Sequence, residues 1–306
     1  MKKRSMRRTS ALQKCVRKQG IMTCMALSLT VAACSGRIHE VSQTDDGKIP
    51  ISIRVVEIDQ VPFGAATRAS DAGDVCKRIT YAIYQGTGEK PDKIQRDQLK
   101  TDASFGTLNI SLEEGVYTLV VIAHNGDGNP TMTVPAKVTF NNKSAGKVTD
   151  TFAYCAPLSV RKDMAPVDVQ LERAVAKLEL KLSDSSIPEQ VSKFLFEVTG
   201  VSQSYNVFTG WGLNSSKVSE SFNVMPVDSV YEMYMFPREG YSTMNVTVSA
   251  QDSLGQEYKK ITVSSVPVTK NKITRCTGEM FRKQILDAAV SVSIGDEWEG
   301  VHSQPF

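Results

Sequence analysis

The stretch VDVQLERAVAKLELKL, residues 167–182, decides how the chain divides. Up to Leu171 apolar residues alternate with polar ones, the period-two pattern of a half-buried strand. After Arg173 the alternation slips by one residue, so that Leu178 and Leu182 take the phase that polar residues held before. Because successive side chains of a strand point to opposite faces, one core cannot bury the apolar residues of both halves. The pattern predicts either a β-bulge within one sheet or a crossing between two β-domains near Arg173-Ala174. We favour the crossing.

Strand-like segments continue on both sides of this stretch, too many for one small sandwich. They cover 51–58, 79–84, 108–112, 116–123, 134–140 and 148–160 before it, and 194–198, 230–236, 244–250, 258–263, 266–278 and 290–294 after it. The polar residues 86–98 are predicted to be an excursion between strands. Short strands separated by turns indicate antiparallel sandwiches. We therefore expect an all-β fold of two tandem antiparallel β-sandwich domains, 48–173 and 174–306.

The first 33 residues have the features of an export signal. Eight basic residues and no acidic ones precede an uncharged run at 21–33, which is too short to span a bilayer. The run ends in Ala32-Ala33-Cys34, which resembles a bacterial lipobox. We predict a lipoprotein signal peptide at 1–33 and lipidation of Cys34. An ordinary signal peptide with a chance cysteine is the alternative.

The residues after the cysteine predict where the protein is held. Ser35 stands where many lipoproteins of the inner membrane have Asp, so we expect an anchor in the outer membrane and exposure at the cell surface. Residues 34–47 are mostly polar and are predicted to form a tether. The several acyl chains of a lipoprotein cysteine suffice for stable attachment.

Removal of the signal reverses the sign of the net charge. Eight of the 36 Lys and Arg residues lie in the signal, which leaves 28 basic residues against 33 acidic ones in the mature chain. No basic patch argues for nucleic acid as a partner.

The sequence lacks the residue patterns of an enzyme. Its three histidines, His39, His124 and His302, lie far apart, without the spacing of a zinc site. No GxSxG motif surrounds a serine. We expect neither catalysis nor a cofactor nor a metal site.

Three cysteines remain in the mature chain beside Cys34: Cys76, Cys155 and Cys276. An odd number allows one disulfide at most. We expect these residues mainly to be small buried apolar side chains, and the sequence leaves open whether two of them pair.

An aromatic, glycine-rich segment at 204–213 is the remaining candidate for binding. Tyr205, Phe208 and Trp211 would form a platform for glycans if exposed, or core residues if buried. We regard the core interpretation as the simpler one.

Several segments in order resemble the FimB/Mfa2 family of fimbrial subunits from Bacteroidales. They are Ala66-Thr67-Arg68-Ala69, ITYAIYQ (79–85), FGTLNISLEEGVYTLVVIAHNGDGNP (105–130), KVTDTFAYCAPLSV (147–160), LERAVAKLELKL (171–182), VSKFLFEVTGVSQSYNVFTGWG (191–212), MYMFPREG (233–240), VPVTKNKITRCTGEMF (266–281) and IGDEWEG (294–300). Their order and spacing carry the resemblance, which covers nearly the whole mature chain.

The resemblance implies two transthyretin-like β-sandwiches on a lipid-anchored outer-membrane subunit of a type V pilus. Such a subunit attaches the fimbrium to the cell, limits its length and meets other pilins by β-strand addition. Shaft subunits of the wider superfamily are cut after an N-terminal arginine, and Arg68 matches that position loosely. Anchor-type members stay uncut. The alternative function is a surface glycan-binding lipoprotein or a fimbrial tip adhesin.

Overall fold

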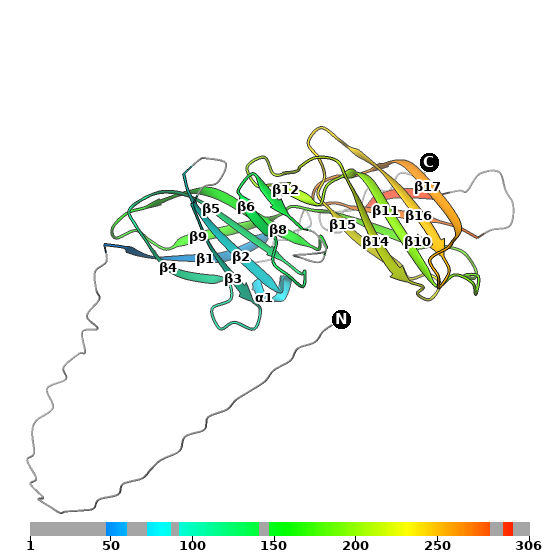
Figure 1. Ribbon diagram of the computed structural model, residues 1–306, viewed down its shortest axis with the longest axis horizontal. Coiled ribbons are helices and arrows are strands. Elements are labelled where there is room, and N and C mark those ends of the chain that lie inside the picture. The colour runs from blue at the N-terminus through cyan, green and yellow to red at the C-terminus, as the bar shows by residue number, and fades with distance from the viewer. Residues whose placement is uncertain (1–46, 60–71, 87–91, 141–146, 282–289, 296–306) are drawn as a thin grey trace, which may run out of the picture. The chain divides into compact units, whose positions relative to one another are not determined.

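The computed structural model describes residues 47–59, 72–86, 92–140, 147–281 and 290–295. These residues form strands almost throughout, which confirms the all-β prediction (Figure 1). The N-terminal half contains β1 (Ile49–Asp59), α1 (Ala72–Val75), β2 (Arg78–Gln85), β3 (Asp92–Leu99), β4 (Thr107–Leu112), β5 (Gly115–His124), β6 (Thr131–Val134), β7 (Lys137–Thr139), β8 (Thr151–Val160) and β9 (Val167–Arg173). The C-terminal half contains β10 (Ala176–Leu182), β11 (Lys193–Val201), β12 (Ser204–Asn206), β13 (Trp211–Gly212), β14 (Ser216–Asn223), β15 (Val230–Met235), β16 (Thr243–Gln251), β17 (Glu257–Pro267), β18 (Ile273–Gly278) and β19 (Val290–Gly295).

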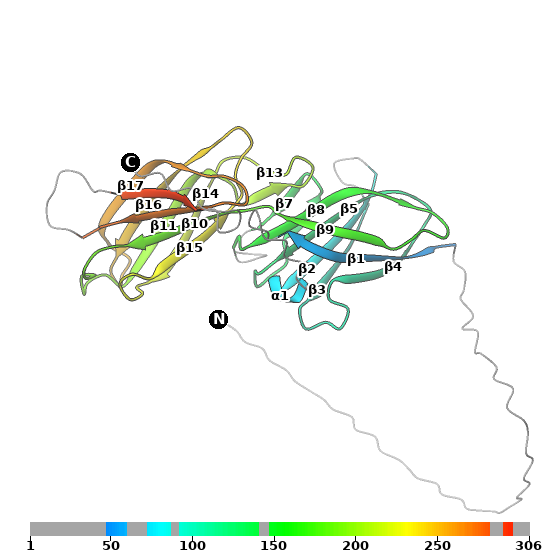
Figure 2. The same cartoon turned by 180° about the vertical axis from the view of Figure 1, so that it is seen from behind.

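The N-terminal half is a seven-stranded sheet that folds over on itself. Its order is β3-β2-β5-β8-β9-β1-β4, and β8 and β9 are joined by the pairs Phe152–Arg173 and Ala153–Glu172. The sheet therefore has two layers, β3-β2-β5-β8 and β9-β1-β4. Figure 2 shows the strands β9, β1 and β4 of the second layer side by side. Between them lies the N-terminal core, whose members include Ile53, Tyr81, Leu119, Val169 and Leu171.

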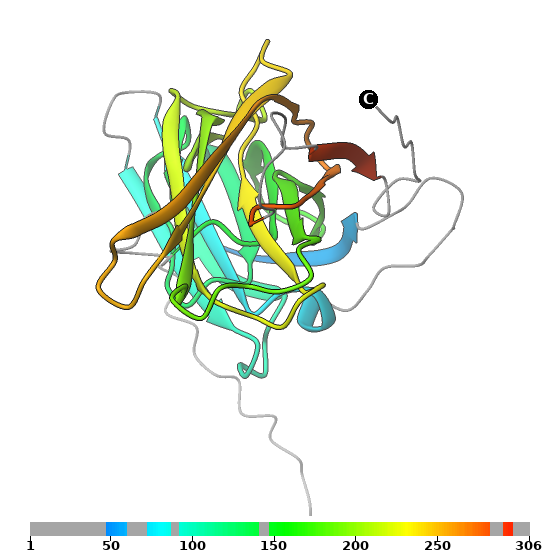
Figure 3. The ribbon, with the colours of Figure 1, turned by 90° about the vertical axis from the view of Figure 1, so that its right-hand side faces the viewer.

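The C-terminal half repeats this topology. Its layers are β14-β11-β16-β17 and β15-β10-β18, with β19 added beside β18. In each half the first strand pairs in parallel with the last strand of the repeat, β1 with β9 and β10 with β18, so the sheets are not purely antiparallel. Figure 3 shows the C-terminal half with β17 in orange and β19 in red. The C-terminal core between its layers includes Leu178, Phe194, Phe196, Tyr231 and Val248.

The phase slip separates these two cores. Val169 and Leu171 pack in the N-terminal core, whereas Leu178 packs in the C-terminal core. Strands β9 and β10 belong to different sheets, so the alternative of a bulge within one sheet is wrong. Ala174 and Val175, between the strands, are buried in a third group.

This third group, the junction cluster, contains residues of both halves. It includes Tyr84, Ile122, Phe140, Tyr205 and Phe236, and it covers the outer face of β2 and β5. Beside it a small sheet of order β13-β12-β7-β6 joins strands of both halves. Residues 45–306 form one compact unit. The proposed division into domains 48–173 and 174–306 stays a prediction.

Arg173 holds the junction at the slip itself. Its guanidinium forms two hydrogen bonds to the Asp150 carboxylate, at 2.8 and 3.1 Å, and donates to Asn271 Oδ1 at 3.1 Å. It also lies over the Phe152 ring, 4.8 Å from its centroid. A buried arginine is tolerated only with such partners. Arg173 thus ties the end of the N-terminal sheet to a turn of the C-terminal half.

One prediction about the N-terminal half is wrong. Residues 86–98, predicted to be a polar excursion, contain strand β3, which pairs with β2 over its full length. The strand lies at the sheet edge, where both of its faces reach solvent except at Ile94, Gln95 and Gln98. An edge strand of this kind shows little apolar alternation, because solvent reaches both of its faces.

Candidate functional site

Two of the predicted site residues lie outside the described residues. Cys34 falls within 1–46 and Arg68 within 60–71, the segment that follows β1. Lipidation and cleavage there stay predictions. In the part of the chain that the structure describes, no helix is long and apolar enough to cross a membrane.

The three residues of the predicted glycan platform have different surroundings. Tyr205 is buried in the junction cluster, where its ring stacks on Phe236 at 5.0 Å between centroids. Phe208 is 60% exposed, and Trp211 is half-buried. The structure therefore does not present the three rings on one exposed surface, because the Tyr205 ring faces inward.

A groove separates the edges of the two layers in the N-terminal half. Strands β3 and β4 end the seven-stranded sheet, so each has one side without a strand partner among the described residues. Between them lies a hollow of about 460 Å³, with Ile94 and Gln95 of β3 on one side and Ile110 and Ser111 of β4 on the other. Two unpaired edges facing each other are a template for an added strand.

The groove is closed at one end by the side chain of Gln98. Its Nε2 donates to the Thr107 carbonyl oxygen at 2.7 Å, and its Oε1 accepts from the Gly106 amide at 3.0 Å. Lys48, which precedes β1, also lines the hollow. Ile94 and Ile110 are half-buried and pack against the N-terminal core, so they supply an apolar strip to a groove that polar and charged residues such as Lys93 also line.

The equivalent edges of the C-terminal half are closed. There β14 and β15 contact each other, and the rings of Phe222 and Tyr231 meet edge-to-face at 5.5 Å. The Tyr231 hydroxyl also accepts from the Met225 amide at 3.0 Å. The open edge is therefore a property of the N-terminal half and not of the shared topology.

A second hollow, of about 450 Å³, lies where β8 and β9 diverge. Its lining consists of residues from both halves: Ala153, Tyr154, Cys155, Gln170, Glu172, Tyr205, Val207, Phe208, Thr209, Gly210 and Lys270. Nζ of Lys270 lies 4.0 Å from Oε2 of Glu172. This site could not be predicted from the sequence, because its charged residues Glu172 and Lys270 are almost a hundred positions apart.

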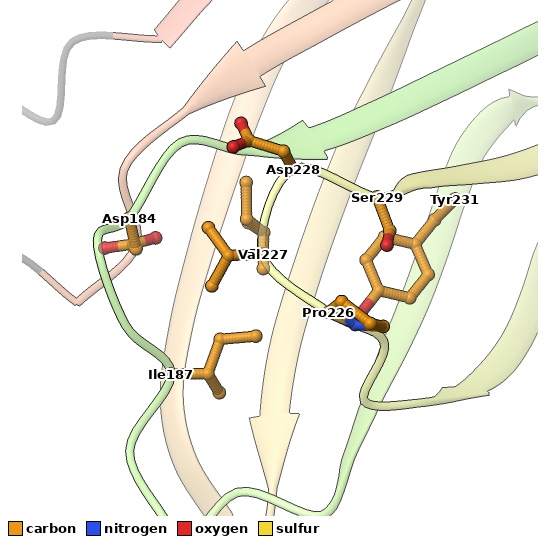
Figure 4. Close-up of a pocket in the computed structure, with 8 residues that line it drawn as sticks. Asp184, Ile187, Pro226, Val227, Asp228, Ser229 and Tyr231 are labelled. Carbon is orange, nitrogen blue, oxygen red and sulfur yellow. The ribbon is translucent and has the colours of Figure 1, made fainter.

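Figure 4 shows a further depression in the C-terminal half, lined by Ile187, Val227 and Tyr231 among others. It has essentially no room for a water molecule. The nearby Asp184 has a structural role, since its carboxylate accepts from the amides of Met280 and Phe281, each at 2.6 Å. This depression is not a binding site.

The cysteines among the described residues are buried or half-buried. Cys155 is a half-buried free thiol and Cys276 a buried one, whereas Cys76 is buried with its Sγ donating to the Ala72 carbonyl oxygen at 3.1 Å. Burial raises the pKa of Cys155 to about 11 and that of Cys276 to about 12, so both stay protonated at neutral pH. No group of three His, Cys, Asp or Glu residues that could hold a metal ion occurs in the described segments.

His124 is buried at the end of β5. Its Nδ1 accepts from the Gly126 amide at 3.0 Å, and its Nε2 has no hydrogen-bond partner in the described structure. Burial and the nearby Arg78 lower the pKa of His124 to about 4, so its ring is neutral at physiological pH. The ring packs edge-on against Phe140. These contacts indicate a structural role.

Comparison with protein families identifies this chain. The model of a family of unknown function, DUF6562, matches residues 43–304. The chain belongs to this family. No functionally curated protein matches this DUF6562 member.

Several solved structures resemble this DUF6562 member. A candidate adhesin from Bacteroides ovatus has a TM-score of 0.50 at 7% identity, over 84% of this chain and 96% of that one. A fimbrial assembly protein from Parabacteroides distasonis has a TM-score of 0.44 at 16% identity, over 84% and 99%. A candidate polysaccharide-binding protein from Bacteroides thetaiotaomicron has 0.49 at 11%, over 83% and 98%. At these identities the similarity concerns the fold.

Proposed function

We propose that this DUF6562 protein is a fimbrial subunit of the FimB/Mfa2 type, anchored in the outer membrane by lipid on Cys34. It attaches the fimbrium to the cell, limits its length and takes no part in catalysis. The fold supports this role, since the similar Bacteroides ovatus structure is that of a candidate adhesin. The lipobox-like Ala32-Ala33-Cys34 and the ordered segments that resemble fimbrial subunits support the anchor and the family.

The groove between β3 and β4 carries the proposal. It offers two free backbone edges over the apolar floor of Ile94 and Ile110, the arrangement that β-strand addition needs. A partner strand in the groove would form main-chain hydrogen bonds to both edges. Its inward side chains would cover the floor.

Replacement of the acylated cysteine tests the anchor. With Cys34→Ala we expect loss of radiolabelled palmitate, release of the protein from the outer membrane, and fimbriae in the medium. Cys155→Ala, which removes another thiol of the mature chain, is the matched control. If the protein is released while fimbriae stay attached with normal length, the anchor role is wrong.

A charge in the groove tests strand addition. Ile110→Glu places a carboxylate on the apolar floor, and we expect the yield of co-purified fimbrial subunits to fall about tenfold or more. Val230→Glu, at a 43%-exposed position on the equivalent strand β15, is the control and should leave the yield unchanged. Circular dichroism verifies that both variants fold. Equal yields from the two folded variants would contradict docking in the groove.

The alternative, a surface glycan-binding lipoprotein or tip adhesin, rests on a different part of the molecule. The predicted platform of Tyr205, Phe208 and Trp211 does not support it in that form, because the ring of Tyr205 is buried. The hollow beside Phe208 supports a saccharide site of another composition.

A further inference from the structure

The hollow where β8 and β9 diverge has the dimensions of a ligand site. Its volume of about 450 Å³ lies within the range of small-molecule pockets, roughly 300–1,000 Å³. The pairs Phe152–Arg173 and Ala153–Glu172 close the sheet on one side of it. Beyond them the two strands diverge, and a loop of the C-terminal half lies across the gap.

This loop, residues 206–210, is fixed by its own hydrogen bonds. The Phe208 amide donates to Asn206 Oδ1 at 3.0 Å, and the Gly210 amide donates to the Asn206 carbonyl oxygen at 2.9 Å. Tyr205, just before the loop, is held by its stack on Phe236. The loop is therefore preorganised, so that binding there would cost little conformational entropy.

Phe208 lines the rim of the hollow with its ring 60% exposed. An exposed aromatic ring on a fixed loop beside a hollow is available to stack on a ligand. Its apolar face suits the C–H face of a sugar ring.

Gly210 keeps the hollow open. Its φ of +74° favours glycine, and a Cβ there would lie 3.6 Å from Lys270 Nζ and 3.8 Å from the Tyr205 hydroxyl. A longer side chain at this position would project towards those two polar groups. Glycine thus leaves the space beside the Lys270 ammonium unfilled.

The charges of the lining select a neutral ligand. Lys270 and Glu172 are the charged side chains among the residues that line the hollow, and they lie 4.0 Å apart. A phosphate or a sugar acid would gain from Lys270 but meet the Glu172 carboxylate. A neutral hydroxyl group can accept from the ammonium and donate to the carboxylate at once.

We propose that this hollow binds a neutral saccharide unit, with its C–H face on Phe208 and its hydroxyl groups between Lys270 and Glu172. Tyr154, Tyr205 and Thr209 also line the hollow. A protein partner is less suited, because its anchoring side chains need desolvated apolar pockets. The site would add glycan recognition to the attachment function and uses no residue of the β3–β4 groove.

The test uses the full chain, purified in detergent, on an array of neutral and acidic oligosaccharides. Calorimetric titration of the best neutral saccharide then compares variants. We expect Phe208→Ser and Lys270→Met each to weaken binding about tenfold or more, the effect of one stacking contact or one charged hydrogen bond. Tyr258→Ser removes a ring that is 51% exposed on β17, outside the hollow, and should leave the Kd within about twofold.

Three results would overturn the proposal. One is failure to bind any neutral saccharide at about 10 mM; another is binding restricted to acidic sugars. The third is an equal effect of Phe208→Ser and Tyr258→Ser. Circular dichroism of each variant verifies folding, and Lys270→Met supplies an independent readout if Phe208→Ser unfolds. A negative result for saccharide binding does not contradict strand addition at the β3–β4 groove, because the co-purification test of Ile110→Glu examines that surface separately.

Discussion

Acidification should destabilise the N-terminal half through His124. The ring is fully buried, and its Nδ1 already accepts a hydrogen bond from the Gly126 amide. A second proton, on Nδ1, would point at the amide hydrogen of Gly126. Among the described residues no carboxylate lies within hydrogen-bond distance of the ring. Burial, and then the positive charge of Arg78, lower the pKa of His124 to about 4 from the ordinary value of 6.5.

The size of the effect follows from proton linkage. Between pH 6.5 and about pH 4 the unfolded chain binds a proton at His124 that the folded chain does not bind, so stability falls as pH falls across this window. Each pH unit costs about 1.4 kcal/mol, which amounts to about 3 kcal/mol over the window. Above pH 6.5 and below pH 4 this residue should contribute no pH dependence.

The assay compares the full chain with His124→Gln, whose amide oxygen can accept from the Gly126 amide but does not titrate. Hydrogen-exchange mass spectrometry of β5 peptides at pH 7, 6, 5 and 4 gives the local free energy of opening after correction for the intrinsic exchange rate. Carboxylates titrate in both proteins and cancel in the difference. We expect the stability of the native chain to fall by about 3 kcal/mol more than that of the variant. Parallel pH profiles would refute the reasoning.

Three other substitutions, the first with a matched control, test the fold. Arg173→Met should destabilise the chain by about 3 kcal/mol in urea denaturation because it removes a buried guanidinium and leaves the half-buried Asp150 carboxylate without this partner, whereas Arg54→Met breaks an exposed pair and should cost about 1 kcal/mol or less. Gly212→Ala should lower the thermal midpoint, since a Cβ there would lie 2.8 Å from a backbone carbonyl oxygen; an unchanged melting curve would contradict this. Asp184→Asn replaces one of two carboxylate acceptors by an amide and should cost about 1–3 kcal/mol, measured by the same denaturation.

The sequence predicted those parts of the fold that depend on the spacing of apolar residues along a strand. The central strand at 116–123 is apolar on both faces, and β5 is indeed buried between the N-terminal core and the junction cluster. The phase slip at Arg173 placed the crossing between sheets, because Leu171 and Leu178 need opposite faces. These signals are local, so a single sequence contains them.

What the sequence did not reveal depends on contacts between distant segments. Strand β3 is polar because it lies at an edge, and without its neighbours it cannot be distinguished from a loop. The inward turn of Tyr205 follows from its stack on Phe236, thirty-one positions later in the chain. The hollow near Lys270 and Glu172 likewise exists only once the two halves have met.

The internal repeat gives the β3–β4 groove its significance. Both halves place their layers in the same order, and the C-terminal half shows that the β14–β15 edge can be closed by Phe222 and Tyr231. The N-terminal half has Ile94 and Ile110 near its corresponding edge, half-buried, with about 460 Å³ between the strands. Topology therefore does not force the groove to be open. Because exposed edges and half-buried apolar floors carry a risk of aggregation, an open groove is most simply understood as a surface that another strand covers.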